Sequence, residues 1–345
     1  MQSKQFIKAG VLTLVLGIAF ITSWELYWRY RGFEPTYNDD KVLWAATRSK
    51  VYQPIDKTTV FIGSSRIKFD LDIPTWEKET GEQAIQLALV GTSPRKILQN
   101  LANDPKFTGK VVVDVTEPLF FSLNPFFNKS ADEAIAYYKD QTPTEKFSSR
   151  VNAVLESRMV FLEENKFSLN MLLEDLEIPS RPGVFMMPPF PKGFEMTLPT
   201  RQTYMSNDFL ADTQLINRQT AIWNILVMGN PAPPLSGEPL QAIMNEVASD
   251  VKKIESKGGR VVFVRTPSSG PMGAAEQKGF PRNIYWDPLL ATAKAKGIHY
   301  ADNPATAKLI CPEWSHLSLS DAAYYTKQFI RELQQEDWFR SDKKN

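Results

Sequence analysis

Two short segments near opposite ends of the chain carry residue types that could activate a serine. Gly63-Ser64-Ser65-Arg66 follows the apolar run Thr58–Ile62, and Glu313 precedes His316 by three residues. A strand that ends in Gly-x-Ser places a serine on a sharp turn at the carboxyl edge of a sheet, where the next helix offers free backbone N–H groups. In a tight turn Glu313 can fix the tautomer of His316, which makes His316 a candidate general base for a serine hydroxyl.

Composition excludes several other kinds of site. The 345 residues include one cysteine, Cys311, and two histidines, His299 and His316, so they supply neither a Cys/His zinc site nor an intramolecular disulfide. No pattern resembles a carboxylate metal site, and we predict no metal and no cofactor. Lys and Arg number 40 and Asp and Glu 39, a net charge of +1 that argues against nucleic acid as the main partner.

Other polar residues near the two segments have competing interpretations. Asp302 could orient the candidate base, although we favour Glu313 for that role. We interpret His299 as a structural histidine at a strand end and Glu117 as a strand-end polar residue rather than a general base. Cys311 has no second basic partner to activate its thiol, so we interpret it as a packing residue.

The elements that must position these residues form an α/β pattern. Hydrophobic residues make up 43% of the chain, enough for a large core. Apolar runs predict strands over 58–62, 83–90, 110–115 and 260–265, and near 298. Helices are predicted over 40–48, 95–104, 239–257, 287–296 and 321–335. Strand, helix and strand joined by short loops predict right-handed parallel α/β units.

The alternation is interrupted in the middle of the chain. Residues 119–180 read as mostly helical, and 181–205 form a loop rich in proline, methionine and aromatic residues. Loops of this length are usually functional lids or disordered segments. The Phe185–Pro191 part lies on the membrane or a partner, covers an acyl-binding cleft, or is simply a pinned surface loop. We therefore predict one α/β domain over 57–340 with a largely helical insertion at about 119–235.

The N-terminal segment is apolar on all sides. Ala9–Trp24 carries no charge, and as a helix it reaches about 24 Å, which flanking residues 6–7 and 26–28 extend toward the roughly 30 Å of a bilayer core. A buried soluble helix would need an amphipathic pattern, and a cleaved signal peptide would need a small-x-small site, which we do not find before Glu25. A single-pass signal anchor fits best.

We accordingly predict a transmembrane helix over 1–28 and a juxtamembrane linker over 29–56. Lys4 and Lys8 favour a cytoplasmic N-terminus, whereas Arg29 and Arg31 lie just beyond the other end. On balance we predict a cytoplasmic N-terminus and a periplasmic or extracellular body.

The two segments together resemble the SGNH hydrolase superfamily, also called GDSL-like. Gly63-Ser64-Ser65 is similar to its Gly-Asp-Ser block, with Ser64 in place of the aspartate, and Glu313-Trp314-Ser315-His316 is similar to its Asp-x-x-His block. Gly91 fits the glycine of the second block. The third block, Gly-x-Asn-Asp, has no counterpart, because the third strand runs into Thr116-Glu117-Pro118. Loss of one oxyanion donor of this kind can cost roughly 100- to 1000-fold in rate.

The resemblance implies a parallel sheet sandwiched by helices and chemistry through an acyl-serine. Ser65 would be the nucleophile, His316 the general base and Glu313 its orienting residue. The backbone N–H groups of Ser65 and Gly91 would form the oxyanion hole. Arg66 either caps a helix or binds an anionic group of the substrate.

The Gly-Ser-Ser-Arg form with an N-terminal membrane helix looks most like membrane-anchored bacterial SGNH proteins. That implies a serine esterase or O-acyltransferase of the inner (cytoplasmic) membrane, acting on acyl esters of a cell-surface polysaccharide or glycolipid. The expected partners are the membrane, the acylated carbohydrate or lipid substrate, and a membrane-bound O-acyltransferase or envelope complex. The alternative is a non-catalytic SGNH-fold scaffold subunit of a cell-envelope polymer modification or export complex.

Overall fold

The computed structural model describes residues 2–33, 35–163, 167, 173, 188–228 and 233–339. The chain divides into two compact units. The smaller one comprises residues 1–38 and 144–186, and the larger one residues 39–143 and 187–345. Each predicted site residue belongs to the larger unit.

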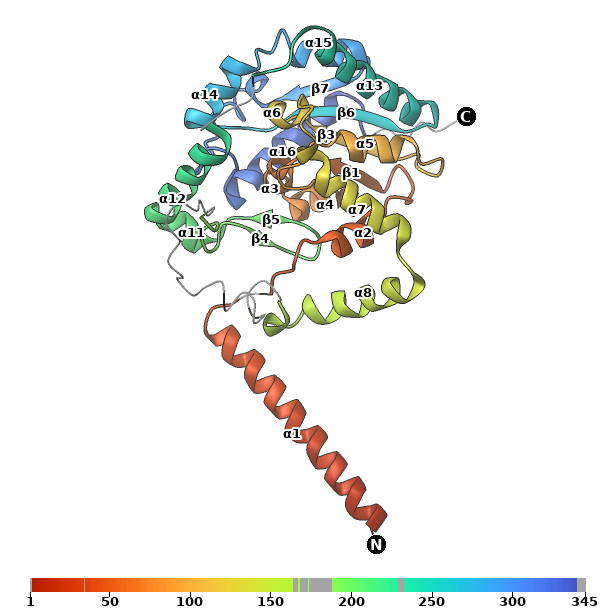
Figure 1. The fold of residues 1–345 in the computed structure, drawn as a ribbon, viewed down its shortest axis with the longest axis vertical. Helices are drawn as coiled ribbons and strands as arrows, with labels where there is room; N and C mark the ends of the chain where they lie inside the picture. The colour runs from red at the N-terminus through yellow and green to blue at the C-terminus, as the bar shows by residue number, and fades with distance from the viewer. Residues whose placement is uncertain are drawn as a thin grey trace. The chain divides into compact units, whose positions relative to one another are not determined.

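A five-stranded parallel sheet forms the centre of the larger unit, in the order β2-β1-β3-β6-β7 (Figure 1). The strands are β1 (Thr58–Ile62), β2 (Gln83–Gln86), β3 (Lys110–Asp114), β6 (Arg260–Arg265) and β7 (Lys296–His299). Val60 pairs with Ile85 on one side and Val111 on the other, and Val111 pairs with Val261. The prediction of an α/β fold with a parallel sheet is confirmed. The chain adds β2 on one side of β1 and then β3, β6 and β7 on the other, so the strand order reverses between β1 and β3. Open parallel sheets bind ligands at such a switch point.

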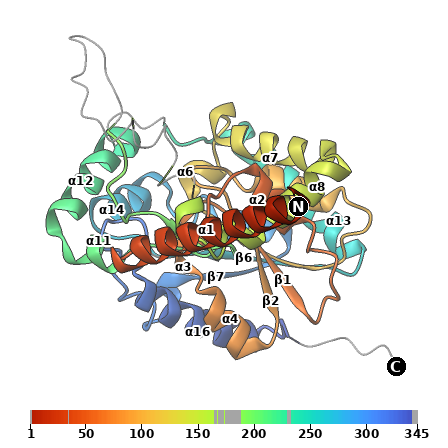
Figure 2. The ribbon, with the colours of Figure 1, turned by 90° about the horizontal axis from the view of Figure 1, so that it is seen from below.

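Helices cover both faces of the sheet because alternate strand residues point to opposite sides. Val111 and Val113 pack into one core with α2 (Lys41–Arg48), α5 (Arg95–Ala102), α7 (Lys129–Asp140), α13 (Gly237–Ser256) and α15 (Trp286–Ala293). Val112 packs into the other core with α3 (Ser65–Asp70), α4 (Ile73–Thr80) and α16 (Leu319–Gln335). Figure 2 shows α4 and α16 on one side of the strands and α7 and α13 on the other.

Three features of the larger unit go beyond the sequence expectation. Helices α3 and α4 separate β1 from β2, and α14 (Gly270–Gly279) follows β6. The predicted loop over 181–205 contains an antiparallel hairpin of β4 (Met196–Thr197) and β5 (Thr203–Tyr204), while its residues 181–187 lie outside the described part. Part of the segment that was predicted to be a loop is therefore a regular hairpin.

The central segment is otherwise helical where it is described. Its elements are α6 (Glu117–Phe120), η1 (Pro125–Asn128), α8 (Pro143–Glu156), η2 (Val160–Leu162), α11 (Asn207–Ala211), α12 (Thr213–Trp223) and a π-helical turn η3 (Asn224–Met228). Helix α7 lies within the same stretch of sequence but packs in the sheet core. A small separate core joins Phe194, Met205 and Phe209 to Phe69 of α3, with Trp223 at its edge.

The smaller unit contains the N-terminal helix α1 (Gln2–Tyr30). Its span Lys4–Tyr30 has a mean hydropathy of 2.0, and none of its most apolar stretch is buried. At about 1.5 Å per residue this span is long enough to cross a bilayer. One N-terminal helix is therefore long and apolar enough to span a membrane.

Candidate functional site

Ser65 is the first residue of α3, immediately after the turn that ends β1. Its neighbour Ser64 is the N-cap: the Ser64 hydroxyl accepts the backbone N–H of Arg66 at 3.3 Å and bonds to the Thr116 hydroxyl at 2.7 Å. Ser64 is buried, whereas Ser65 is partly exposed. The two serines thus differ in environment, and Ser65 is the one that a ligand could reach.

Gly63 permits the close packing that creates this turn. A Cβ at this position would lie 2.5 Å from Ile67 Cγ2 and 2.6 Å from Asp114 Cβ, closer than real Cβ contacts come. Only glycine therefore lets β1 turn into α3 against the end of β3.

The segment that carries the predicted base forms a tight buried turn. Glu313 Oε1 lies 3.0 Å from His316 Nδ1 and also accepts the backbone N–H groups of Ser315 and His316 at 3.2 and 2.6 Å. Trp314 within the turn has a φ of 80°, a left-handed conformation that costs a non-glycine residue about 1–3 kcal/mol. The two backbone N–H groups mark Oε1 as an acceptor, so a proton on His316 Nδ1 would complete its third bond and leave the lone pair on Nε2.

The alternative orienting residue, Asp302, has a different partner. Its carboxylate pairs with the Arg282 guanidinium, with Nη2 2.8 Å from Oδ2. In this arrangement Glu313, rather than Asp302, contacts the imidazole.

Aromatic residues surround the His316 ring. It stacks on Phe69 of α3 with the ring centroids 4.2 Å apart, and the Phe194 and Trp223 rings lie at 5.8 and 6.0 Å. The indole N–H of Trp223 donates to Glu313 Oε2. His316 is 1% exposed, and among the described residues its Nε2 has no hydrogen-bond partner.

Helix α3 brings the serine turn and the histidine loop together. Ser65 and Phe69 are four residues apart and share one helix face, so Ser65 lies one turn from the ring on which His316 stacks. At the other end of α3, Asp70 Oδ1 accepts the Leu317 N–H at 2.9 Å. No hydrogen bond joins Ser65 to His316 Nε2 in the described part of the chain.

The glycine of the second block lies on a loop beside the serine turn. The Leu89 N–H bonds to the Gly63 carbonyl at 3.2 Å, and Gly91 follows two residues later with a φ of 61°. The third block has no counterpart in the sequence, and the residue that follows β3 by two positions is Thr116. Its hydroxyl contacts Asp114 Oδ2 at 3.1 Å as well as Ser64.

A buried ionic network lies behind the serine turn. Arg66 donates through both terminal nitrogens to Glu276 of α14, and Arg265 at the end of β6 joins Glu276 (2.7 Å) to Glu117 (2.9 Å). All four side chains are buried. Thus the Arg66 guanidinium, predicted either to cap a helix or to bind an anionic group, faces protein carboxylate, and Glu117 pairs with arginine at the strand end.

The carboxylates of this network differ because they have different numbers of cationic neighbours. Burial alone would raise the pKa of Glu276, but Arg66 and Arg265 lower it to about 2. Glu117 has one arginine partner, and there burial dominates and raises its pKa. Burial also raises the pKa of Asp70, at the last residue of α3, and of Asp114, at the end of β3.

His299 and Cys311 lie in largely buried surroundings that fit packing roles. His299 Nδ1 accepts the Ala301 N–H at 3.2 Å, and burial lowers its pKa to about 4. Burial raises the pKa of the Cys311 thiol well above its ordinary value, which favours the unreactive form. Among the described residues, no group of three Cys, His, Asp or Glu side chains is arranged to hold a metal ion.

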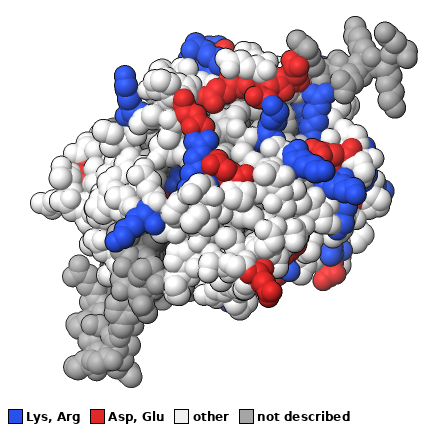
Figure 3. Space-filling model, turned by 90° about the horizontal axis from the view of Figure 1, so that it is seen from above, with Lys and Arg blue, Asp and Glu red and all other residues white. Residues whose placement is uncertain are grey.

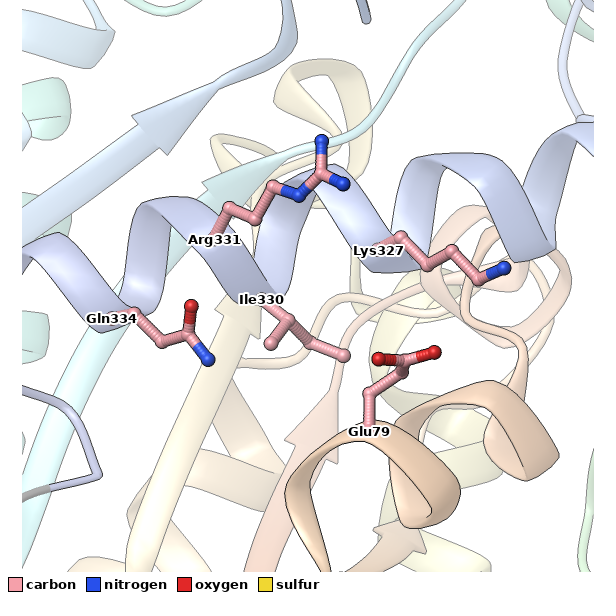
Figure 4. Close-up of a pocket in the computed structure, with 5 residues that line it drawn as sticks. All are labelled: Glu79, Lys327, Ile330, Arg331 and Gln334. Atoms are coloured by element: carbon pink, nitrogen blue, oxygen red, sulfur yellow. The ribbon is translucent and has the colours of Figure 1, made fainter.

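Two surface cavities of the larger unit lie outside the serine–histidine site. One of about 290 Å³ lies between α4 and α16 and is lined by Glu79, Lys327, Ile330, Arg331 and Gln334 (Figure 4). The other, of about 480 Å³, lies beside the loop after β2, where Leu89 and Val90 contribute to its wall. Neither is lined by Ser65 or His316, which is consistent with the aromatic cover over the imidazole.

Charged side chains are mixed on the face drawn in Figure 3, where Lys and Arg alternate with Asp and Glu instead of forming a basic stripe. Compared with models of known protein families and with curated protein sequences, the chain shows no match. The likeness to SGNH proteins therefore rests on its short motifs alone.

Proposed function

We propose that this protein is a membrane-anchored, extracytoplasmic serine esterase or O-acyltransferase of the SGNH-like type. The observation that carries the proposal is the buried Glu313–His316 pair, in which His316 Nε2 has no hydrogen-bond partner among the described residues. A histidine used only for structure would normally satisfy both ring nitrogens when fully buried. Ser65 on the same face of α3 as the stacked Phe69 supplies a nucleophile within one helical turn.

The reaction begins when Ser65 Oγ attacks the carbonyl carbon of an ester. The Ser65 proton passes to His316 Nε2, and Glu313 stabilises the resulting imidazolium through Nδ1–H. The backbone N–H groups of Ser65 and Gly91 hold the negative oxygen of the tetrahedral intermediate. The C–O bond to the alcohol then breaks, and His316 returns the proton to the leaving oxygen.

An acyl group remains on Ser65 after the first half-reaction. Water or a sugar hydroxyl attacks this ester and gives its proton to His316, which then reprotonates Ser65 Oγ as the acyl–serine bond breaks. Hydrolysis and transfer share every protein group and differ in the second nucleophile. The aromatic surroundings of His316 are suited to an acyl chain, and we propose acyl esters of a cell-surface polysaccharide or glycolipid as the substrates.

The anchor and the partners belong to the same proposal. Helix α1 would hold the body at the outer face of the cytoplasmic membrane, with the N-terminus inside. A membrane-bound O-acyltransferase or an envelope complex would supply or receive the acyl group there.

A non-catalytic scaffold subunit is the second candidate, and two observations favour it. Ser65 makes no hydrogen bond to His316 Nε2 in this arrangement. The sequence after β3, where Thr116 bonds to Ser64, has no counterpart of the third-block asparagine. In that case the SGNH-like fold would serve only to bind a polymer or a membrane partner.

Active-site labelling of the full chain in detergent with a fluorophosphonate probe separates the two candidates. We expect the wild type to be labelled, and Ser65→Ala and His316→Ala to lose the label. Ser64→Ala is the matched control, because it removes the adjacent, buried hydroxyl and should keep the label. A wild type that is folded by near-UV circular dichroism but not labelled would support the scaffold, and labelling that persists in Ser65→Ala would refute the assigned nucleophile.

A further inference from the structure

Helix α8 of the smaller unit turns its apolar side outward. Phe147, Val151, Val154 and Leu155 are 70, 43, 53 and 44% exposed. Their spacing of four, three and one places them on one face of the helix. No residue of α8 is buried. These four residues are called the α8 apolar face below.

The other side of α8 is polar and more enclosed. Glu145, Asn152 and Glu156 lie opposite the apolar face, and Ser149 and Glu156 are partly covered. Arg150, which is exposed, borders the apolar face along one edge. A surface helix of a soluble protein packs its apolar side inward. Helix α8 does the reverse within the part of the chain that the structure describes, which leaves its apolar face available to an apolar partner.

Contacts within the smaller unit locate α8 beside the end of the apolar helix α1. Glu25 of α1 accepts the backbone N–H groups of Val160 and Phe161 at 3.1 and 3.4 Å, and Arg29 donates to the Arg158 carbonyl at 2.8 Å. The backbone bond from Met159 N–H to the Leu155 carbonyl, 3.0 Å, continues directly from α8 into this segment.

The part of α1 that holds this segment has the composition of a membrane–water interface. Trp24, Tyr27 and Trp28 surround Glu25, and their rings pack on one another at 5.2–5.9 Å. Tryptophan and tyrosine concentrate at the headgroup level of membrane helices. The C-terminal end of α8 is thus tied to the level at which α1 would leave a bilayer.

We propose that α8 lies on the surface of the lipid bilayer, with the α8 apolar face inserted between headgroups and acyl chains. An interfacial helix has this distribution, with an apolar face, cations at its border and acids on the side facing away from lipid. Lipid is favoured over a protein partner because the same unit carries the membrane-type helix and its aromatic belt. Arg150, at the border of the face, would meet anionic headgroups.

The test uses the full chain in nanodiscs of phosphatidylethanolamine and phosphatidylglycerol, with and without a phospholipid brominated near the top of its acyl chains. Val151→Cys and the matched control Asn152→Cys each receive an environment-sensitive fluorophore. Position 151 lies within the α8 apolar face, and position 152, about 100° further round the helix, lies outside it. Cys311 is buried, so the wild type serves as the labelling blank. Both substitutions are at exposed positions, and circular dichroism of the unlabelled variants checks that they fold.

We expect the label at residue 151 to emit at shorter wavelength and to lose most of its emission to brominated lipid. The label at residue 152 should emit as in water and lose little. Equal, water-like emission at both positions would overturn the proposal. Emission at residue 151 that is shifted but not quenched would also overturn it, because the apolar face would then be covered by protein rather than lipid.

Discussion

Removing the negative charge of Glu276 should destabilise the larger unit strongly, because this carboxylate is shared by two buried arginines. Arg66 and Arg265 both donate to it, and Ser268 Oγ adds a further bond at 2.8 Å. With Glu117 the network contains two positive and two negative side chains. Glu276→Gln leaves it with a net positive charge away from water, next to the turn that carries Ser65.

The size of the effect can be estimated from the pKa of Glu276. Its lowering from 4.5 to about 2 corresponds to about 3 kcal/mol, at roughly 1.4 kcal/mol for each pH unit. Breaking one side of a buried ion pair costs about 3–5 kcal/mol in other proteins. Because the folded-state pKa is lowered, this stabilisation is complete above pH 4.5 and is lost as the pH falls toward 2.

Urea unfolding of the full chain in detergent, followed by near-UV circular dichroism, measures the change. We expect Glu276→Gln to lose about 3–5 kcal/mol at pH 7. The control Glu133→Gln, whose exposed carboxylate lies 3.9 Å from Lys129, should lose less than about 0.5 kcal/mol. The double variant Arg66→Met/Glu276→Gln restores neutrality and should be more stable than the sum of its single changes. A loss below about 1 kcal/mol in Glu276→Gln, or strict additivity in the double variant, would refute this account of the network.

Three further predictions concern single side chains. Gly63→Ala should lower the free energy of unfolding by about 1–3 kcal/mol in urea titrations, because its Cβ would collide with two neighbours; unchanged stability would contradict the close packing. Trp223→Phe removes the N–H donor to buried Glu313. We expect it to slow fluorophosphonate labelling about ten- to hundredfold, equivalent to about 1.5–3 kcal/mol. An unchanged labelling rate would show that this hydrogen bond does not affect the reactivity of the site. Burial lowers the folded-state pKa of His299 to about 4. Relative to His299→Asn, the wild type should therefore lose up to about 3 kcal/mol of stability as the pH falls from 6.5 to 4. Parallel curves of unfolding free energy against pH for the two proteins would contradict this prediction.

The strands could be predicted because runs of apolar residues mark segments that are buried. Each of β1, β3 and β6 contains three or four consecutive apolar residues (Val60–Ile62, Val111–Val113 and Val261–Val264) with polar or charged residues at one or both strand ends, as strands covered on both faces should. Helix α4 was missed although its signals were present: Asp72 accepts the Thr75 N–H, Pro74 lies in the first turn, and Gly81 ends the helix with a φ of 71°. Its shortness, eight residues with two buried, hid the amphipathic pattern.

The site could be predicted only where its residues are neighbours in sequence. Glu313 and His316 are three residues apart, so their contact follows from a local turn. Trp223 reaches Glu313 across 90 residues of sequence, and neither composition nor periodicity indicates such a pairing. The sequence predicts that Arg66 either caps a helix or binds an anionic group, but its partner Glu276 lies 210 residues away. Long-range polar pairs of this kind depend on topology, which spacing alone does not encode.

The hydrogen bond from Trp223 to Glu313 connects the aromatic residues around His316 with the carboxylate that contacts its imidazole. The Phe194 and Trp223 rings lie beside the imidazole, which is 1% exposed, so we expect a ligand that reaches His316 Nε2 to displace side chains such as these. Moving Trp223 withdraws a donor from one oxygen of Glu313, while the backbone of the histidine turn continues to hold the other. A buried carboxylate that loses a donor costs about 1–3 kcal/mol. Under the proposed mechanism, opening the aromatic cover would therefore withdraw support from the carboxylate that orients His316. We expect the pair to be fully supported only when Trp223 packs back against Glu313 with the substrate inside, in line with the slower labelling expected of Trp223→Phe.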